Sequence, residues 1–315
     1  MSALETSSSS APPASPARAA SAPAAPSRAR LAGAAVAFTI LTWASAFPLI
    51  RLALRDLAPL PLAALRFAVA AGCVLLWLAA ARPPRPTGRH LLRFGLCGLV
   101  GIALYNGLLN AGQRSVTAGA ASFIVNTLPI ITAILATLFL GERFKLWGWI
   151  GTGISFAGIA LIASGQPGGL AFGAGASLIL AAATCQAVYF ILQRPLVPRY
   201  GALAATAYTL LAGAILLAPW LPEAIRTVAA PGASPTTLPA VVALGVLPAA
   251  LGYAAWTYAL GHFGAARAAN FLYLVPPVAT ALAFLIAGEV PAPTTLAGGA
   301  VAVAGVIVVN TRGRG

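Results

Sequence analysis

The chain has 315 residues, of which 60% are hydrophobic and only 8% are charged. A soluble domain carries about a quarter of charged residues, so this composition and a mean hydropathy of +0.90 exclude an ordinary soluble protein. The net charge of +14 does not indicate a nucleic-acid partner, because the arginines stand singly or in small groups between apolar runs.

The N-terminal stretch, residues 1–30, begins with Ser, Ala and Pro and has hardly a large apolar side chain before residue 28. Such a segment cannot bury enough surface to order itself, so we expect a disordered cytoplasmic tail. Arg28 and Arg30 before an apolar run, with Ala44 to Ala46 further on, resemble a signal peptide. We favour a retained span, because the apolar run continues to Leu54 and the second half contains an equivalent helix.

Ten apolar runs are long enough to span a bilayer, which takes about 20 residues. The strands of a membrane barrel would instead alternate polar and apolar residues. The sequence therefore predicts an all-α membrane protein with ten transmembrane helices, at roughly 31–53, 61–81, 91–111, 116–140, 146–164, 173–193, 202–221, 239–261, 266–288 and 294–310.

The basic residues predict the orientation. Fourteen Lys and Arg residues fall in the gaps on the side of the two termini, and four fall in the opposite gaps. Because positive loops stay in the cytoplasm, both termini are predicted to be cytoplasmic, in a multi-pass protein of the bacterial inner membrane.

Residues 114–165 return in altered form as 262–313. Each copy has an apolar run with a proline, Pro129 or Pro276, then a Gly-Glu pair and a second apolar run. A one-residue slip also pairs Tyr105 with Tyr253. An internal duplication of this kind changes the interpretation of the whole chain.

The duplication predicts two five-helix repeats, at 31–165 and 166–315. Five is odd, so the second repeat crosses the membrane in the sense opposite to the first. Inverted repeats are typical of secondary transporters, whose substrate site lies at the membrane midplane between the halves.

Some motifs have a family resemblance. Trp-Ala-Ser at 43–45 with Phe47, the Leu-Gly-Glu-Arg of 140–143 and the Ala-Gly-Glu of 287–289 resemble the drug/metabolite transporter superfamily, and within it the EamA-type ten-helix exporters. The resemblance implies a central cavity lined by helices three, four, eight and nine, with one and six moving beside it. Helix nine departs from the pattern, because it ends in Gly-Glu-Val-Pro without a basic residue.

Polar side chains inside a span cost free energy, so they tend to face a cavity or another helix. Several spans carry an amide or aromatic stripe at helical spacing, and aromatic rings with polar tips suit the wall of such a cavity. The alternative is that the amides only bond between helices. We predict a substrate-binding set of Trp43, Asn106, Asn126, Gln186, Tyr189, Tyr253, Trp256, Asn270 and Tyr273.

Pro129 and Pro276 are each expected to remove a backbone hydrogen bond in mid-helix, and we predict hinges there, with packed kinks as the alternative. Arg66 lies close enough to the end of its span to snorkel to the headgroups; holding a substrate carboxylate is the other interpretation. Glu142 and Glu289 are expected to cap helix ends or to pair with nearby bases.

The sequence lacks the residues that other classes of membrane protein require. No acidic residue or His lies in mid-span, so a proton relay has no obvious carrier. No metalloprotease motif, Cys–His cluster or phosphate loop occurs, which argues against an enzyme, a metal site and a cofactor. The three cysteines lie singly in apolar runs. Glycines in the fifth and tenth spans predict close helix contact, and a homodimer through these helices is one arrangement that would use them.

These features predict an inner-membrane exporter of small metabolites, with amino acids as the favoured substrates, that works by alternating access around a midplane cavity. Its partners are then a small-molecule substrate and the lipid bilayer. The alternative is a non-transporting membrane receptor or structural subunit whose cavity binds a ligand or lipid.

Overall fold

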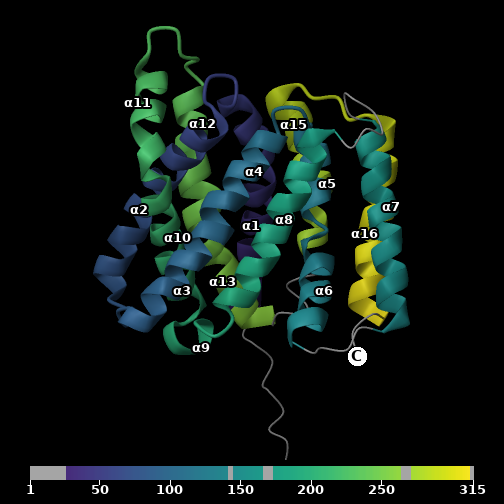
Figure 1. Cartoon of the computed structure of the whole chain (residues 1–315), viewed down its shortest axis with the longest axis horizontal. Coiled ribbons are helices and arrows are strands. Elements are labelled where there is room, and N and C mark those ends of the chain that lie inside the picture. The colour runs from purple at the N-terminus through teal and green to yellow at the C-terminus, as the bar shows by residue number, and fades with distance from the viewer. Residues whose placement is uncertain (1–25, 141–144, 166–172, 264–270, 313–315) are drawn as a thin grey trace, which may run out of the picture.

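A computed structural model describes residues 26–140, 145–165, 173–263 and 271–312. Within these ranges every regular element is a helix, and no strand occurs. The helices stand side by side in one bundle, and the start of α1 and the end of α16 lie at the same side of it (Figure 1).

The first half of the chain contains helices that follow the predicted spans closely. They are α1 (Pro26–Ala53), α2 (Pro59–Ala81), α3 (Gly88–Gly98), the π-helix η1 (Leu99–Leu104), α4 (Tyr105–Gly112), α5 (Ala118–Val125), α6 (Leu128–Leu140) and α7 (Leu146–Ser164).

The second half contains α8 (Ala174–Gln193), α9 (Val197–Tyr200), α10 (Ala202–Leu217), the 3₁₀ turn η2 (Ala218–Trp220), α11 (Leu221–Ala229), α12 (Thr237–Val246), the π-helix η3 (Leu247–Leu251), α13 (Gly252–Phe263), the 3₁₀ turn η4 (Leu272–Leu274), α15 (Val275–Ala287) and α16 (Pro293–Arg312).

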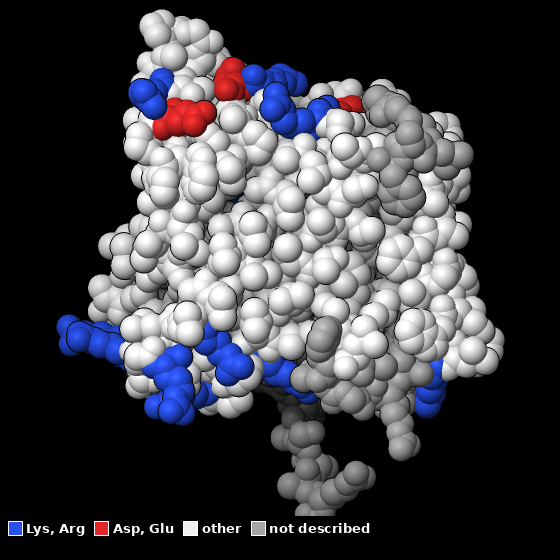
Figure 2. Space-filling model, viewed as in Figure 1, with Lys and Arg blue, Asp and Glu red and all other residues white. Residues whose placement is uncertain are grey.

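Six of the described helical stretches are long and apolar enough to cross a membrane, and four shorter apolar helices accompany them. Figure 2 shows the same property on the surface: the charged side chains gather at the two ends of the bundle and leave an uncharged belt between them. Large apolar side chains such as Leu76 and Leu285 are exposed on the surface. The fold is therefore that of an all-helical membrane protein.

Two of the predicted spans contain a π-helical segment, η1 before α4 and η3 before α13. π-Helical turns are rare and occur often at functional sites. Tyr105 follows η1 directly, and Tyr253 follows η3 after one glycine. The two π-helices thus occupy matching positions of the two predicted repeats.

The prolines of the predicted hinges are not in mid-helix. Pro129 is the second residue of α6, which begins after a break at Asn126 and Thr127, and Pro276 is the second residue of α15, which follows η4. The backbone nitrogen of a first-turn residue has no intrahelical acceptor, so proline fits there without loss of a hydrogen bond. The helix is interrupted before each proline.

Lipid is as apolar as the interior of the bundle, so helices in a membrane are held together mainly by close van der Waals packing. Small residues allow this packing because they let two helix backbones approach each other. A Cβ added to Gly158 of α7 would lie 2.6 Å from the carbonyl oxygen of Gly298 in α16. One added to Gly305 would lie 2.5 Å from that of Gly151. The predicted glycine contact is therefore made between α7 and α16 of one chain.

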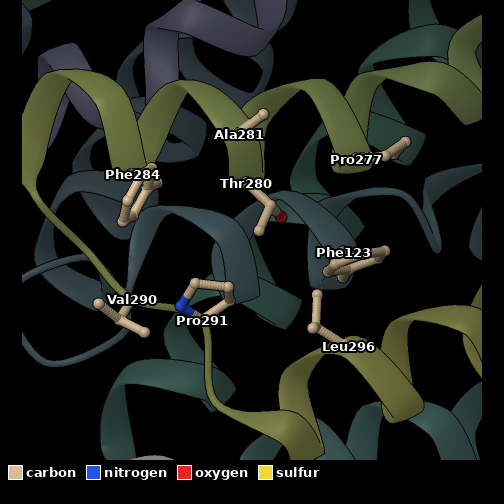
Figure 3. A pocket seen from close by; sticks show the side chains of 8 residues that line it. All are labelled: Phe123, Pro277, Thr280, Ala281, Phe284, Val290, Pro291 and Leu296. Atoms are coloured by element: carbon tan, nitrogen blue, oxygen red, sulfur yellow. The ribbon is translucent and has the colours of Figure 1, made fainter.

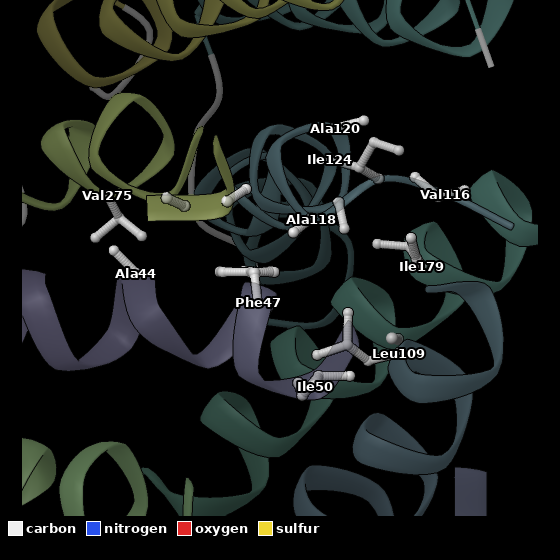
Figure 4. Close-up of a cluster of buried hydrophobic side chains, with 14 of the residues drawn as sticks. Ala44, Phe47, Ile50, Leu109, Val116, Ala118, Ala120, Ile124, Ile179 and Val275 are labelled. Atoms are coloured by element: carbon white, nitrogen blue, oxygen red, sulfur yellow. The ribbon is translucent and has the colours of Figure 1, made fainter. Parts of the chain in front are cut away.

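The central packing involves α1, which lies against both α13 and α15. Ala44, Phe47 and Ile50 from α1 meet apolar side chains of α4, α5, α8 and α15 in one buried cluster (Figure 4). The side chain of Ile50 is 1% exposed. The cluster connects helices of both halves and lies beside the polar and aromatic groups described next.

Candidate functional site

Three aromatic residues of the predicted binding set meet between α1 and α13. The ring of Trp43 lies 5.4 Å from that of Tyr253 and 5.5 Å from that of Trp256, measured between centroids. The rings are tilted, which suits the quadrupoles of aromatic pairs. The indole Nε1 of Trp43 donates a hydrogen bond to the carbonyl oxygen of Pro248 in η3, 3.2 Å away.

Gly252 allows this close approach of α13 to α1. A Cβ at this position would lie 2.8 Å from Nε1 of Trp43 and 3.0 Å from Oγ1 of Thr42. The hydroxyl of Thr39 also lies 3.5 Å from the carbonyl oxygen of Gly252. In the sequence Gly-Tyr-Ala-Ala-Trp of 252–256, the glycine therefore allows α1 to pack closely, and Tyr253 and Trp256 contact Trp43.

Arg66 lies inside the bundle and not at the headgroups, so the predicted snorkelling is wrong. The residue is 8% exposed. Its Nη1 donates to Oδ1 of Asn106 at 3.1 Å, and Nδ2 of Asn106 donates to the carbonyl oxygen of Ile102 in η1. A partner forty positions away in the chain holds the guanidinium inside, where it is less costly than in lipid.

Residues of both halves meet around this arginine. Tyr105, from the first half of the chain, and Tyr253, from the second, both lie near Arg66. The hydroxyl of Tyr253 interacts in turn with the side chain of Gln186, whose Oε1 has no hydrogen-bond partner. We call Arg66, Tyr105, Asn106, Gln186 and Tyr253 the central polar cluster.

The predicted binding set omits Arg66 and Tyr105, although holding a substrate carboxylate is one of the two interpretations of Arg66. Two features of the sequence point toward this cluster: the polar face of the third span, which contains Asn106, and the pairing of Tyr105 with Tyr253 in the predicted repeat. Neither signal shows which helix faces α4, and α2 supplies the arginine.

The other predicted residues lie elsewhere or make local contacts. Nδ2 of Asn126 is 3.4 Å from the carbonyl oxygen of Ser122 in the preceding turn. Tyr189 is 2% exposed and packs with Phe94 and Cys97. Tyr273 packs beside Ile130 and Val306. Asn270 lies outside the described residues, as do Glu142 and Arg143.

A polar contact closes the upper end of the bundle in Figure 1. Nε of Arg51, near the end of α1, is 2.8 Å from Oε1 of Glu289, which follows α15. Oε2 of Glu289 accepts a hydrogen bond from the backbone N–H of Ala118 at 2.8 Å. Glu289 thus caps the start of α5, as a carboxylate should at a helix N-terminus, and pairs with a base. We call Arg51, Glu289 and the Ala118 N–H the end latch.

A groove of about 430 Å³ lies apart from these groups, between α5, α15 and the start of α16 (Figure 3). Phe123, Phe284 and Leu296 line it with other apolar side chains. Its one hydroxyl, on Thr280, donates to the carbonyl oxygen of Pro276. This lining has no charge and no free donor for a zwitterion.

A second hollow, of about 600 Å³, lies at the end of α2 and is lined by Arg82, Arg85 and Tyr208 among others. In the part of the chain that the structure describes, no three His, Cys, Asp or Glu side chains gather in a way that could hold a metal ion. Cys73, Cys97 and Cys185 are free thiols.

These observations define an all-helical membrane protein with a buried polar and aromatic centre. The chain belongs to the EamA-like transporter family, whose model matches residues 31–164 and 173–311. The family is one of transporters and not of enzymes. The apolar helices of this chain and its bacterial relatives are consistent with a multi-pass protein of the inner membrane.

Several relatives carry transporter names. A probable terminal-alkyne amino-acid exporter of Streptantibioticus cattleyicolor is 39% identical over 88% of this chain and 93% of the relative. The uncharacterized transporter YdfC of Bacillus subtilis is 35% identical over 84% and 86%, and the uncharacterized inner membrane transporter YedA of Escherichia coli K12 is 30% identical over 82% and 83%. One solved crystal structure, 21% identical, covers 88% of this chain and 96% of its own with a TM-score of 0.59, and so shares the fold.

Proposed function

We propose that this protein exports small amino acids across the bacterial inner membrane by alternating access around the central polar cluster. The observation that carries the proposal is the meeting of Arg66 and Tyr105 with Tyr253, because it places groups from both halves at one buried centre. The exporter of Streptantibioticus cattleyicolor supports the substrate class, since its name specifies amino acids and it is 39% identical.

Ten spans in two inverted repeats are part of the proposal. The family model matches two stretches that correspond to the predicted repeats. In Figure 1, α6 ends at the lower side of the bundle, whereas its predicted counterpart α15 ends at the upper side. The matching π-helices η1 and η3 and the matching breaks before Pro129 and Pro276 support the same plan.

We assign the lower side of Figure 2 to the cytoplasm. Its described charges are basic, whereas acidic side chains appear at the upper side. By the tendency of basic loops to stay inside, both termini would be cytoplasmic. The end latch would then close the outer side.

We infer the role of each side chain from its position in the bundle. Trp43, Tyr253 and Trp256 would form an aromatic wall, and Asn106 and Gln186 would offer amide groups beside it. Asn126, Tyr189, Asn270 and Tyr273 remain predicted members of the binding set. The breaks before Pro129 and Pro276 would serve as hinges, because broken helices line the site of many transporters.

Energy for export would come from the gradient of the substrate itself. Of the acidic side chains that the structure describes, Asp56 and Glu289 lie outside the helices and Glu223 is exposed in the first turn of α11, so none lies in mid-span to carry a proton. The test is flux of a labelled amino acid into proteoliposomes with and without a pH gradient. We expect flux above that of empty liposomes in both conditions, and strict dependence on the gradient would contradict uncoupled transport.

The alternative function is a receptor or structural subunit that binds a ligand or lipid without moving it. The apolar groove of Figure 3 favours a lipid contact on the flank of the bundle. Such a protein would give no flux above empty liposomes. A homodimer through α7 and α16 remains a prediction, and it would have to use faces other than their glycine contacts, which are occupied within the chain.

A further inference from the structure

Arg66 is a buried charge with an unpartnered donor. It lies seven residues after Pro59, about 10 Å into α2 at 1.5 Å per residue, and it is 8% exposed. Asn106 accepts from Nη1, whereas Nε has no hydrogen-bond partner. An arginine stays protonated in proteins, so the free edge of the guanidinium offers a charged donor to a ligand.

No carboxylate neutralises this charge among the described residues. Glu289 pairs with Arg51. Asp56 accepts hydrogen bonds from the backbone of Ser234 and the hydroxyl of Thr237, and Glu223 is exposed on α11. A buried ion without a counter-ion is costly, and a protein gains from retaining one where a ligand supplies the opposite charge.

The other groups of the cluster suit the rest of an amino acid. Oε1 of Gln186 is buried and unpartnered, and it would accept a hydrogen bond from an ammonium group. Tyr253, which interacts with Gln186, joins the aromatic wall with Trp43 and Trp256. Aromatic faces attract a cation as well as an apolar side chain.

We propose that Arg66 is the carboxylate-binding residue of the substrate site and selects α-amino acids over analogues that lack the anionic carboxylate. Asn106 fixes one nitrogen of the guanidinium and directs the Nε edge toward the carboxylate. Carboxylates bind guanidinium groups through short, charge-assisted hydrogen bonds. This inference rests on the proposed function, since it names the part of the substrate that the same site recognises.

The test is calorimetric titration of the full chain in lipid nanodiscs. The probes are L-propargylglycine, which is a small amino acid with a terminal alkyne, its carboxamide, and homopropargylamine, which lacks the carboxylate. We expect the acid to bind roughly tenfold to a hundredfold more tightly than either analogue. Equal responses to the three probes, including no response to any, would overturn the proposal.

Variants test the residue itself. Arg66→Gln should remove the preference for the acid, and Arg66→Lys should keep part of it, because a lysine supplies the charge without the planar fork. The exposed Arg55 provides the matched control, and Arg55→Gln should bind as the wild type does. An Arg66→Gln protein that keeps the preference would overturn the proposal.

Two further measurements separate the alternatives. Removing an unpaired buried charge should leave the melting temperature of ligand-free Arg66→Gln at or above that of the wild type, and a fall of many degrees would show a structural role instead. In proteoliposomes, flux that Arg66→Gln leaves unchanged would remove this assignment and leave transport standing. Wild-type protein that binds the acid selectively but gives no flux would remove transport and leave the assignment standing.

Discussion

Arg51 and Glu289 are 238 positions apart in the chain, yet their side chains meet with 2.8 Å between Nε and Oε1. Nη1 of Arg51 also donates to the carbonyl oxygen of Gln113 at 2.5 Å. The latch therefore connects α1, the end of α4, the start of α5 and the segment after α15. It links the two predicted halves at the end of the bundle that we assign to the outside.

Glu289→Gln should loosen this end. The amide keeps an acceptor for the N–H of Ala118 but loses the charge that pairs with Arg51. A partly exposed ion pair contributes about 1 kcal/mol at most, which corresponds to a change of about fivefold in an opening equilibrium. We expect a cysteine at the buried Val116, between the end of α4 and the start of α5, to react up to about fivefold faster with a water-soluble maleimide.

The measurement uses a background in which Cys73, Cys97 and Cys185 are replaced by alanine. Glu223→Gln is the matched control, because Glu223 is exposed on α11. Labelling that is equally fast in the two variants would show that the latch does not govern access.

A pair of glycines in α7 predicts opposite effects of one substitution. A Cβ on Gly158 would lie 2.4 Å from the backbone nitrogen of Ala302, whereas one on Gly153 meets no atom within 4 Å. Gly153→Ala should raise the melting temperature slightly, because alanine favours a helix by up to about 1 kcal/mol. Gly158→Ala should lower it, since forced backbone shifts cost about 1–3 kcal/mol. The same sign for both would contradict the close contact of α7 and α16.

Truncation of the aromatic wall should reduce transport without loss of the folded protein. For Trp256→Ala we expect a fall of roughly tenfold in flux at low substrate concentration, as for a central binding residue, and Trp256→Phe should retain more activity. The control is Trp220→Ala, because Trp220 lies in η2, away from the aromatic wall, and is 37% exposed. Unchanged flux through Trp256→Ala, in protein that reaches the membrane, would remove this residue from the site.

Pro276→Ala separates a hinge from a packed helix start. Pro276 lies in the first turn of α15, where its missing N–H is no loss, so the substitution should change the melting temperature little. A hinge role predicts a lower initial rate of flux at saturating substrate. If rate and stability are both unchanged, the break before α15 does not limit the conformational change.

The positions of the spans could be predicted from the sequence, because lipid imposes long apolar runs on any helix that crosses it. The seventh span was predicted to end at 221, but the helical stretch continues to Ala229. Glu223 and Arg226 interrupt the apolar pattern there, while the helix itself extends beyond the belt. Polarity in the sequence shows where lipid ends and not where a helix ends.

The contacts between helices could not be predicted from the apolar pattern of the sequence. Arg66 meets Asn106 because α2 faces α4, and the sequence shows only that each residue is polar. The π-helices were also unforeseen, and so was the close contact inside η1 at Gly101, where a Cβ would lie 2.4 Å from Cγ of Tyr189. By contrast, the predicted repeat paired Tyr105 with Tyr253, and both tyrosines lie near Arg66.

Counterflow tests the central claim, alternating access by a single substrate site, most directly. Proteoliposomes loaded with unlabelled L-propargylglycine are diluted into a trace of the labelled amino acid. The account predicts a transient accumulation of label above its equilibrium level, which Arg66→Gln abolishes and Arg55→Gln leaves intact. Label that only approaches equilibrium, or that never enters, would contradict it.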